Sequence, residues 1–240
     1  MSLAANKKTA RLAGLLYLLV VITGIFSLAY VPSKLIVRTD AAATFQNIAA
    51  SETLFRMSLV SSAFCYLAFL LLPFALYFLL RSVNETAAKM MVVLAIVSVP
   101  ISMLNLQNKY AVLTLINGAE HLKIVDQQQI YSQLMMLLKN YDHGILIVQI
   151  FWGLWLLPFG FLVYRSGFLP RILGVLLMLG CFGYLFSFVG NTMMPEYGAT
   201  VIARFVRMPG SFGEIGTGLW LLIRGIHERP LPEVQAWMNK

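Results

Sequence analysis

The sequence contains few charged residues and very little cysteine or histidine. Asp, Glu, Lys and Arg make up 12% of the 240 residues, about half their usual share in soluble domains. Two cysteines and three histidines exclude a disulfide scaffold and leave little material for a metal site. Hydrophobic residues make up 59% of the chain and the mean hydropathy is +0.78, so we expect an integral membrane protein.

Motifs that mark several classes of enzyme and binding protein are also absent. The sequence has no glycine-rich phosphate loop and no CxxC or HExxH spacing, and Ser211 is not part of a GxSxG elbow. Cys65 and Cys181 lie inside apolar runs, as buried small hydrophobic residues do. The net charge of +8 comes from scattered basic residues and not from a basic patch. We therefore expect no metal, no cofactor and no nucleic-acid partner.

Six apolar windows are long enough to cross a bilayer core of about 30 Å, which takes about 20 helical residues. They cover residues 11–31, 57–80, 90–112, 143–164, 170–190 and 208–225. The first follows basic residues as a signal peptide does, but its apolar stretch is long enough for a retained helix. The sequence therefore predicts an all-α bundle of six membrane helices, or alternatively five, in a single domain covering residues 1–240.

Basic residues in the short connections predict the orientation of these helices. Arg81, Lys89, Arg165 and Arg171 all fall on the side that would also hold both chain ends. Because cytoplasmic loops carry an excess of Lys and Arg, we expect both termini in the cytoplasm, with tails at 1–10 and 226–240. The protein would then be a multi-pass membrane protein with both chain ends on the cytoplasmic side.

The longer connections on the opposite, outer side have a helical pattern of their own. In residues 126–141, Ile130, Leu134, Leu138 and Tyr141 recur at helical spacing after a polar start. This pattern predicts an amphipathic helix that lies on the outer surface or caps the bundle. Segment 40–55 is a second, weaker example.

Short sequences recur along the chain and indicate an internal repeat. The LLPF sequence occurs at 71–74 and at 156–159, and the GLWLL sequence occurs at 153–157 and at 218–222. Three helical hairpins repeated in parallel would account for these matches. Pro73 and Pro158 each remove a backbone hydrogen bond, so we expect kinks in their helices.

Polar residues gather in the outer halves of the third, fourth and sixth predicted helices. Ser98, Ser102, Asn105 and Lys109 share one helical face, and such a face is stable in a membrane only if it points inward or lines water. The candidate ligand-binding set is Asn105, Asn108, Lys109, Asp142, Gln149, Arg207, Ser211 and Glu214. Since a charge within the membrane needs a partner, we expect Glu214 to pair with Lys109 or with Arg207.

Three functions fit this polar cluster. The first is binding of a small or amphiphilic, lipid-like ligand in an outer-facing cavity between the third, fourth and sixth helices. The second is a membrane enzyme for a lipid or quinone-like substrate, in which His143, Glu214 and Arg207 are the candidate catalytic residues. The third is a transporter, which the missing inverted repeat and the apolar cytoplasmic halves disfavour. Contact with membrane lipid is expected in each case, and a protein partner or a homo-oligomer stays open.

The sequence resembles a bacterial family of six-helix membrane proteins known only as a domain of unknown function. The resemblance rests on residues 11–14 (RLAG), 149–160 (QIFWGLWLLPFG), 164–170 (YRSGFLP) and 173–174 (LG), and it spans about residues 7–226. It implies an inner-membrane location and carries no activity or site residue with it.

Overall fold

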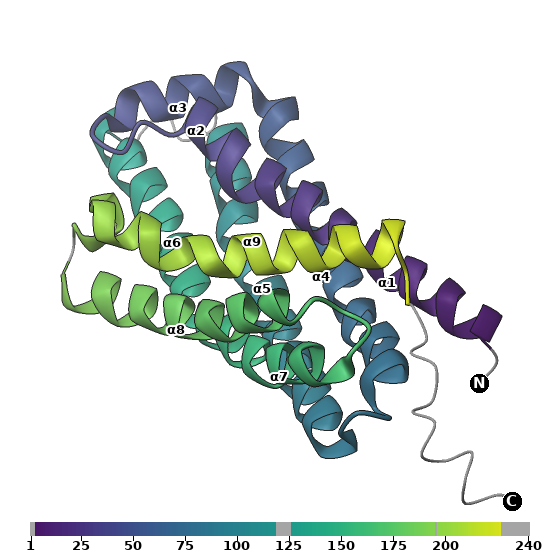
Figure 1. Ribbon diagram of the computed structural model, residues 1–240. Coiled ribbons are helices and arrows are strands. Elements are labelled where there is room, and N and C mark those ends of the chain that lie inside the picture. The colour runs from purple at the N-terminus through teal and green to yellow at the C-terminus, as the bar shows by residue number, and fades with distance from the viewer. Residues whose placement is uncertain (1–2, 119–125, 195, 227–240) are drawn as a thin grey trace, which may run out of the picture.

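The computed structural model describes residues 3–118, 126–194 and 196–226, which form helices and turns with no strand in these ranges (Figure 1). The first long helix comprises α1 (Leu3–Ile25), a π-helical segment η1 (Phe26–Tyr30) and α2 (Val31–Leu35). It is followed by α3 (Ala41–Ala50), α4 (Glu52–Leu80), α5 (Glu85–Gly118), α6 (Gln127–Leu154), α7 (Leu156–Ser166), α8 (Arg171–Met193), a 3-10 turn η2 (Tyr197–Ala199) and α9 (Val201–Ile223).

Five helical segments are long and apolar enough to cross a membrane. They are Lys7–Leu35, Glu52–Leu80, Glu85–Gly118, Gln127–Ser166 and Arg171–Met193, which supports the predicted multi-pass membrane protein. The helix α9 is not among them. Its glycines and the charged residues Arg204, Arg207 and Glu214 lower its hydropathy, so a sixth span stays a prediction.

The segment predicted as an outer surface helix is the first half of a long helix. Residues 127–141 continue without a break into the apolar part of α6. Ile130, Leu134 and Leu138 are buried in a core cluster with side chains of α3, α4 and α5. The helical period was correct, and because the apolar face packs against neighbouring helices, the packing favours the expected placement against the bundle. Segment 40–55 does contain a separate short helix, α3, which Asp40 caps at its N-terminus.

The two predicted proline kinks have different outcomes. Around Pro158 the helix is interrupted at Trp155, which separates α6 from α7. Proline at 158 has no N–H to donate to the carbonyl of Leu154, so the break lies where that hydrogen bond is missing. By contrast, α4 continues as one helix through Pro73. The three-hairpin repeat stays a prediction.

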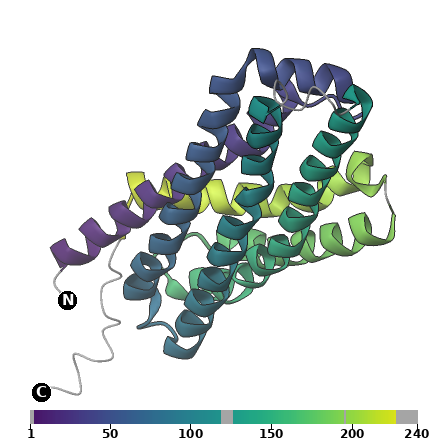
Figure 2. The ribbon, with the colours of Figure 1, turned by 180° about the vertical axis from the view of Figure 1, so that it is seen from behind.

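The helices α8 and α9 lie side by side and run across the direction of α4, α5 and α6 (Figures 1 and 2). Small residues allow their close contact, because a Cβ added to Gly180 would lie 2.6 Å from the Cα of Gly210. Gly14 of α1 is similarly close to the backbone of Leu222 in α9. The hairpin α8–α9 therefore packs tightly against α1, and the cavities described below lie at this junction.

Most of the interior is an apolar cluster in which α1, α4, α5, α7 and α8 meet. Trp155, Phe159 and Leu72 are completely or almost completely buried in this cluster. Cys65 and Cys181 are buried and form no disulfide, as expected. Of the predicted tail at 226–240, residues 227–240 lie outside the described residues.

Candidate ligand-binding cavity

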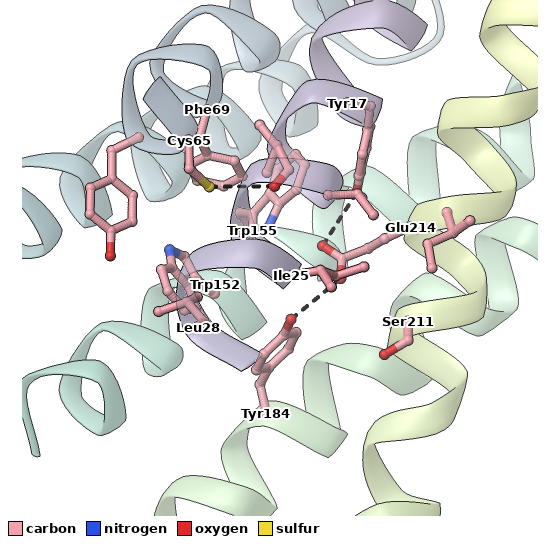
Figure 3. Close-up of a pocket in the computed structure, with 15 residues that line it drawn as sticks. Tyr17, Ile25, Leu28, Cys65, Phe69, Trp152, Trp155, Tyr184, Ser211 and Glu214 are labelled. Carbon is pink, nitrogen blue, oxygen red and sulfur yellow. Dashed lines mark hydrogen bonds between the residues drawn. The ribbon is translucent and has the colours of Figure 1, made fainter. Parts of the chain in front are cut away.

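Two adjoining cavities lie between the first long helix, α6, α8 and α9. The polar cavity has a volume of about 400 Å³ and its polar lining residues include Arg38, Lys109, Asp142, Gln149, Arg207 and Ser211. The apolar cavity has a volume of about 230 Å³ and is lined by aromatic side chains together with Glu214 (Figure 3). Leu28, Trp152, Tyr184 and Ser211 line both cavities. The two cavities are therefore neighbours, with these four residues at their junction.

Glu214 lies at the wall of the apolar cavity between two tyrosines. The hydroxyl of Tyr17 in α1 donates a hydrogen bond of 3.3 Å to Glu214 Oε1, and the hydroxyl of Tyr184 in α8 donates one of 3.3 Å to Oε2 (Figure 3). Each carboxylate oxygen thus has one phenolic donor. The arrangement ties α1, α8 and α9 together and places a carboxylate in an otherwise aromatic pocket.

Stacked aromatic rings form the deep wall of the apolar cavity. The indole of Trp155 lies 5.1 Å from the ring of Phe69, edge to face, and 5.1 Å from the ring of Phe159, in a stacked arrangement. Tyr17 contacts the same two rings, with centroid distances of 6.3 Å to Trp155 and 6.2 Å to Phe159. Because these rings are held on several sides, this wall is a rigid apolar surface.

Lys109 reaches into the polar cavity from α5 and is almost fully buried, with 2% of its surface exposed. Its Nζ atom donates a hydrogen bond of 3.3 Å to the backbone carbonyl of Ser27 and lies 4.5 Å from the centre of the Tyr141 ring. A carbonyl dipole and an aromatic face both stabilise an ammonium group. No carboxylate of the described residues forms an ion pair with it.

The π-helical segment explains why the Ser27 carbonyl is available to Lys109. The N–H of Val31 donates to the carbonyl of Phe26, five residues earlier. The next donor in this register would be the N–H of residue 32, which is proline and has none. The carbonyl of Ser27 therefore loses its helical partner, and the ammonium group of Lys109 takes that place.

The remaining polar wall contains one ion pair and an amide without a partner. Arg38 and Asp142 form an ion pair of 2.6 Å, in which both side chains are partly exposed. The Oε1 atom of Gln149 is buried and has no hydrogen-bond partner. Arg207 is exposed at the cavity wall, and its Nε atom donates to the carbonyl of Ala203 in its own helix. Ser211 donates weakly to the carbonyl of Arg207, at 3.4 Å.

Comparison with known proteins places the chain in a family. The family model described as a domain of unknown function, DUF4386, matches residues 12–225. The chain belongs to the DUF4386 family. An uncharacterised protein of Archaeoglobus fulgidus is 32% identical over 160 residues, which are 67% of this chain and 76% of that relative. No solved structure matches the chain. The family resemblance is thus confirmed, while a bacterial inner-membrane location stays a prediction.

In this DUF4386 chain, two of the expected polar residues support the cavity without lining it. The side-chain amide of Asn105 donates a hydrogen bond of 2.9 Å to the carbonyl of Tyr141, and its oxygen accepts one of 3.0 Å from Asn108. Asn105 also packs directly on Gly144, where a Cβ would overlap its amide. These contacts fix α5 against α6 and so position Lys109 beside Tyr141.

One sequence-based expectation about this DUF4386 chain was wrong, and the catalytic role of His143 stays a prediction. Glu214 forms no ion pair with Lys109 or Arg207, and its two oxygens instead accept hydrogen bonds from the hydroxyls of Tyr17 and Tyr184. His143 is exposed and lines neither cavity, because its place on α6 directs it away from the face that carries Gln149. His143 and Glu214 therefore do not line a common cavity.

Metal binding has no structural support within residues 3–118, 126–194 and 196–226. No group of three or more His, Cys, Asp or Glu side chains is close enough there to hold an ion.

Sequence reasoning missed Tyr17, whose position in the first helix gives no sign of a contact 197 residues away. It also missed Ser27, although Pro32 in an otherwise helical segment was a usable signal of a disturbed hydrogen-bond register.

Proposed function

We propose that this protein binds a small amphiphilic, lipid-like molecule in the two-part cavity. The observation that carries the proposal is the direct junction of a polar cavity and an aromatic cavity, which share Leu28, Trp152, Tyr184 and Ser211. A ligand with one polar end and one apolar end matches such a pair, because each end then lies in a matching environment.

The lining of the two parts supports this assignment of the two ends. The apolar part offers the rings of Phe69, Trp152 and Trp155 together with the aliphatic side chains of α1. These surfaces suit an acyl or isoprenoid chain or a flat apolar ring. The polar part offers charged and amide groups in a larger volume. A headgroup there would contact α5, α6 and α9, the helices that the sequence analysis expected to line the site.

A binding role accounts for the geometry better than the enzyme alternative. Glu214 accepts hydrogen bonds from two tyrosines in the apolar part, and His143 lies on another face of α6 and lines neither part. General acid–base chemistry needs its groups within hydrogen-bonding reach of one reacting atom. Lys109, Gln149 and Arg207 converge on one cavity as binding groups do.

A variant that blocks the junction tests the proposal. Ser211→Trp places an indole where the two cavities meet, and Thr192→Trp is the matched control. Thr192 is also an exposed hydroxyl residue that donates to its own helix, but it lines neither cavity. Both variants would be purified in mild detergent and compared with the wild type by native mass spectrometry with extraction of bound lipids.

We expect a discrete amphiphile on the wild type and on Thr192→Trp, and its loss from Ser211→Trp at unchanged monodispersity. Retention of the same molecule by Ser211→Trp would contradict the proposal. So would a wild-type protein that carries no amphiphile.

A further inference from the structure

The polar part of the cavity holds more positive than negative charge. Three cationic side chains, Arg38, Lys109 and Arg207, line it together with a single carboxylate, that of Asp142. The carboxylate is already paired with Arg38 at 2.6 Å. Lys109 and Arg207 are therefore left facing the same cavity without a carboxylate partner among the described residues.

Of these two cations, Lys109 has the greater need for a compensating negative charge, because it is almost fully buried. Only 2% of its surface is exposed, and its ammonium group has three N–H donors, of which one reaches the Ser27 carbonyl. Asp142 interacts with it electrostatically across the cavity but forms its ion pair with Arg38. A buried charge without a directly bonded counter-ion is unfavourable in a low-dielectric interior. The carbonyl and the Tyr141 ring lower this cost but carry no net charge. An anion in the cavity would complete the environment of this side chain.

Arg207 supplies the second half of an anion site. Its Nε atom donates to the Ala203 carbonyl, and no described residue bonds its two terminal nitrogens. A guanidinium group with two open N–H pairs matches the oxygens of a phosphate or carboxylate. Gln149, whose Oε1 is buried without a partner, adds an amide that accepts from a ligand hydroxyl or, when turned, donates to an oxygen.

We infer that the polar group of the ligand is an anion, a phosphate or carboxylate, which Lys109 and Arg207 bind. This inference rests on the proposed function, because it names the chemistry of the group in the polar part of the same cavity. The shared chemistry has two sources, an anionic lipid headgroup and a free anion. The experiment below separates these sources.

The first arm measures headgroup preference. The protein is reconstituted in nanodiscs of equal parts phosphatidylglycerol and phosphatidylcholine, and retained lipids are counted by native mass spectrometry after release. Lys109→Met and Arg207→Gln each remove one cavity cation. Lys139→Met and Arg204→Gln are the matched controls, because both residues are exposed, Lys139 on α6 and Arg204 on α9, and line neither cavity.

We expect the wild type to retain at least about tenfold more phosphatidylglycerol than phosphatidylcholine. A hydrogen bond to a charged group typically changes affinity by at least about this factor. Lys109→Met and Arg207→Gln should abolish this preference, and the two controls should keep it. Arg207 is exposed, so Arg207→Gln tests the inference even if Lys109→Met does not fold. Equal retention of both lipids by the wild type would overturn the inference, as would an unchanged preference in Arg207→Gln.

The second arm uses sodium phosphate on delipidated protein in neutral detergent and records the melting temperature. A rise for the wild type that Arg207→Gln lacks, without retention of either lipid, means that the free anion is the ligand. The inference then holds and the proposed amphiphile function fails. If the wild type retains both lipids equally and Ser211→Trp retains neither, the proposed amphiphile function holds and the inference of an anionic group fails. Absence of both lipid and phosphate binding would overturn both.

Discussion

The ammonium group of Lys109 and the backbone carbonyl of Ser27 are 82 residues apart in sequence and 3.3 Å apart in space. Their contact depends on a π-helical turn, in which Val31 bonds to Phe26 and Pro32 has no N–H to offer. The first long helix thereby leaves the Ser27 carbonyl without a helical N–H partner. The ammonium group that bonds to this carbonyl comes from α5. This contact fixes a buried positive charge at the wall of the polar cavity.

Replacing Lys109 by methionine should not destabilise the ligand-free protein. Methionine fills a similar volume, and the substitution removes a buried charge that has no carboxylate partner. The lost hydrogen bond from a charged donor to a carbonyl is worth about 1.5–3 kcal/mol, which removal of the buried charge offsets. We therefore expect the melting temperature of the delipidated variant to equal or exceed that of the wild type. A fall of several degrees would mean that Lys109 supports the fold.

The two tyrosines that donate to Glu214 should contribute separately to stability. Tyr17→Phe and Tyr184→Phe each remove one hydrogen bond to a carboxylate oxygen. We expect each to lower stability by about 1–2 kcal/mol, which is a fall in melting temperature of about 2–8 °C. Thermal unfolding measured beside Tyr110→Phe, a substitution at an exposed tyrosine, checks this. Melting temperatures equal to that of the control would show that Glu214 does not tie the three helices together.

Gly144 should not tolerate a larger side chain. A Cβ at this position overlaps the side-chain amide of Asn105, which is itself bonded to the Tyr141 carbonyl. Gly144→Ala should therefore cost about 1–3 kcal/mol, as overpacking does. Gly118→Ala is the matched control, since nothing lies within 4 Å of a Cβ there. Equal melting temperatures for the two variants would contradict the described contact between α5 and α6.

The sequence predicted much of the helical layout, because long apolar runs have few alternatives in a membrane. It also predicted correctly that the polar face of α5 points inward, since Ser98, Ser102, Asn105 and Lys109 are all buried. It left residues 126–141 either on the outer surface or against the bundle, because helical periodicity identifies an apolar face but not what covers that face. It paired Glu214 wrongly, because charge alone suggested an ion pair and two distant tyrosines supplied the hydrogen bonds.

The turn between α4 and α5 tests the predicted orientation of the chain. Ser82 is exposed in that turn, and the basic residues around it predict the cytoplasmic side. In a variant without Cys65 and Cys181, Ser82→Cys should react with a membrane-impermeant thiol reagent only after the cells are opened. Labelling in intact cells would reverse the orientation.

The most direct test of the central claim is a density map of the wild-type protein in phosphatidylglycerol nanodiscs. We predict one continuous density that begins between Lys109 and Arg207, passes the junction formed by Trp152, Tyr184 and Ser211, and ends against Trp155. A junction closed by side chains, with no density connecting the two parts of the cavity, would contradict the account.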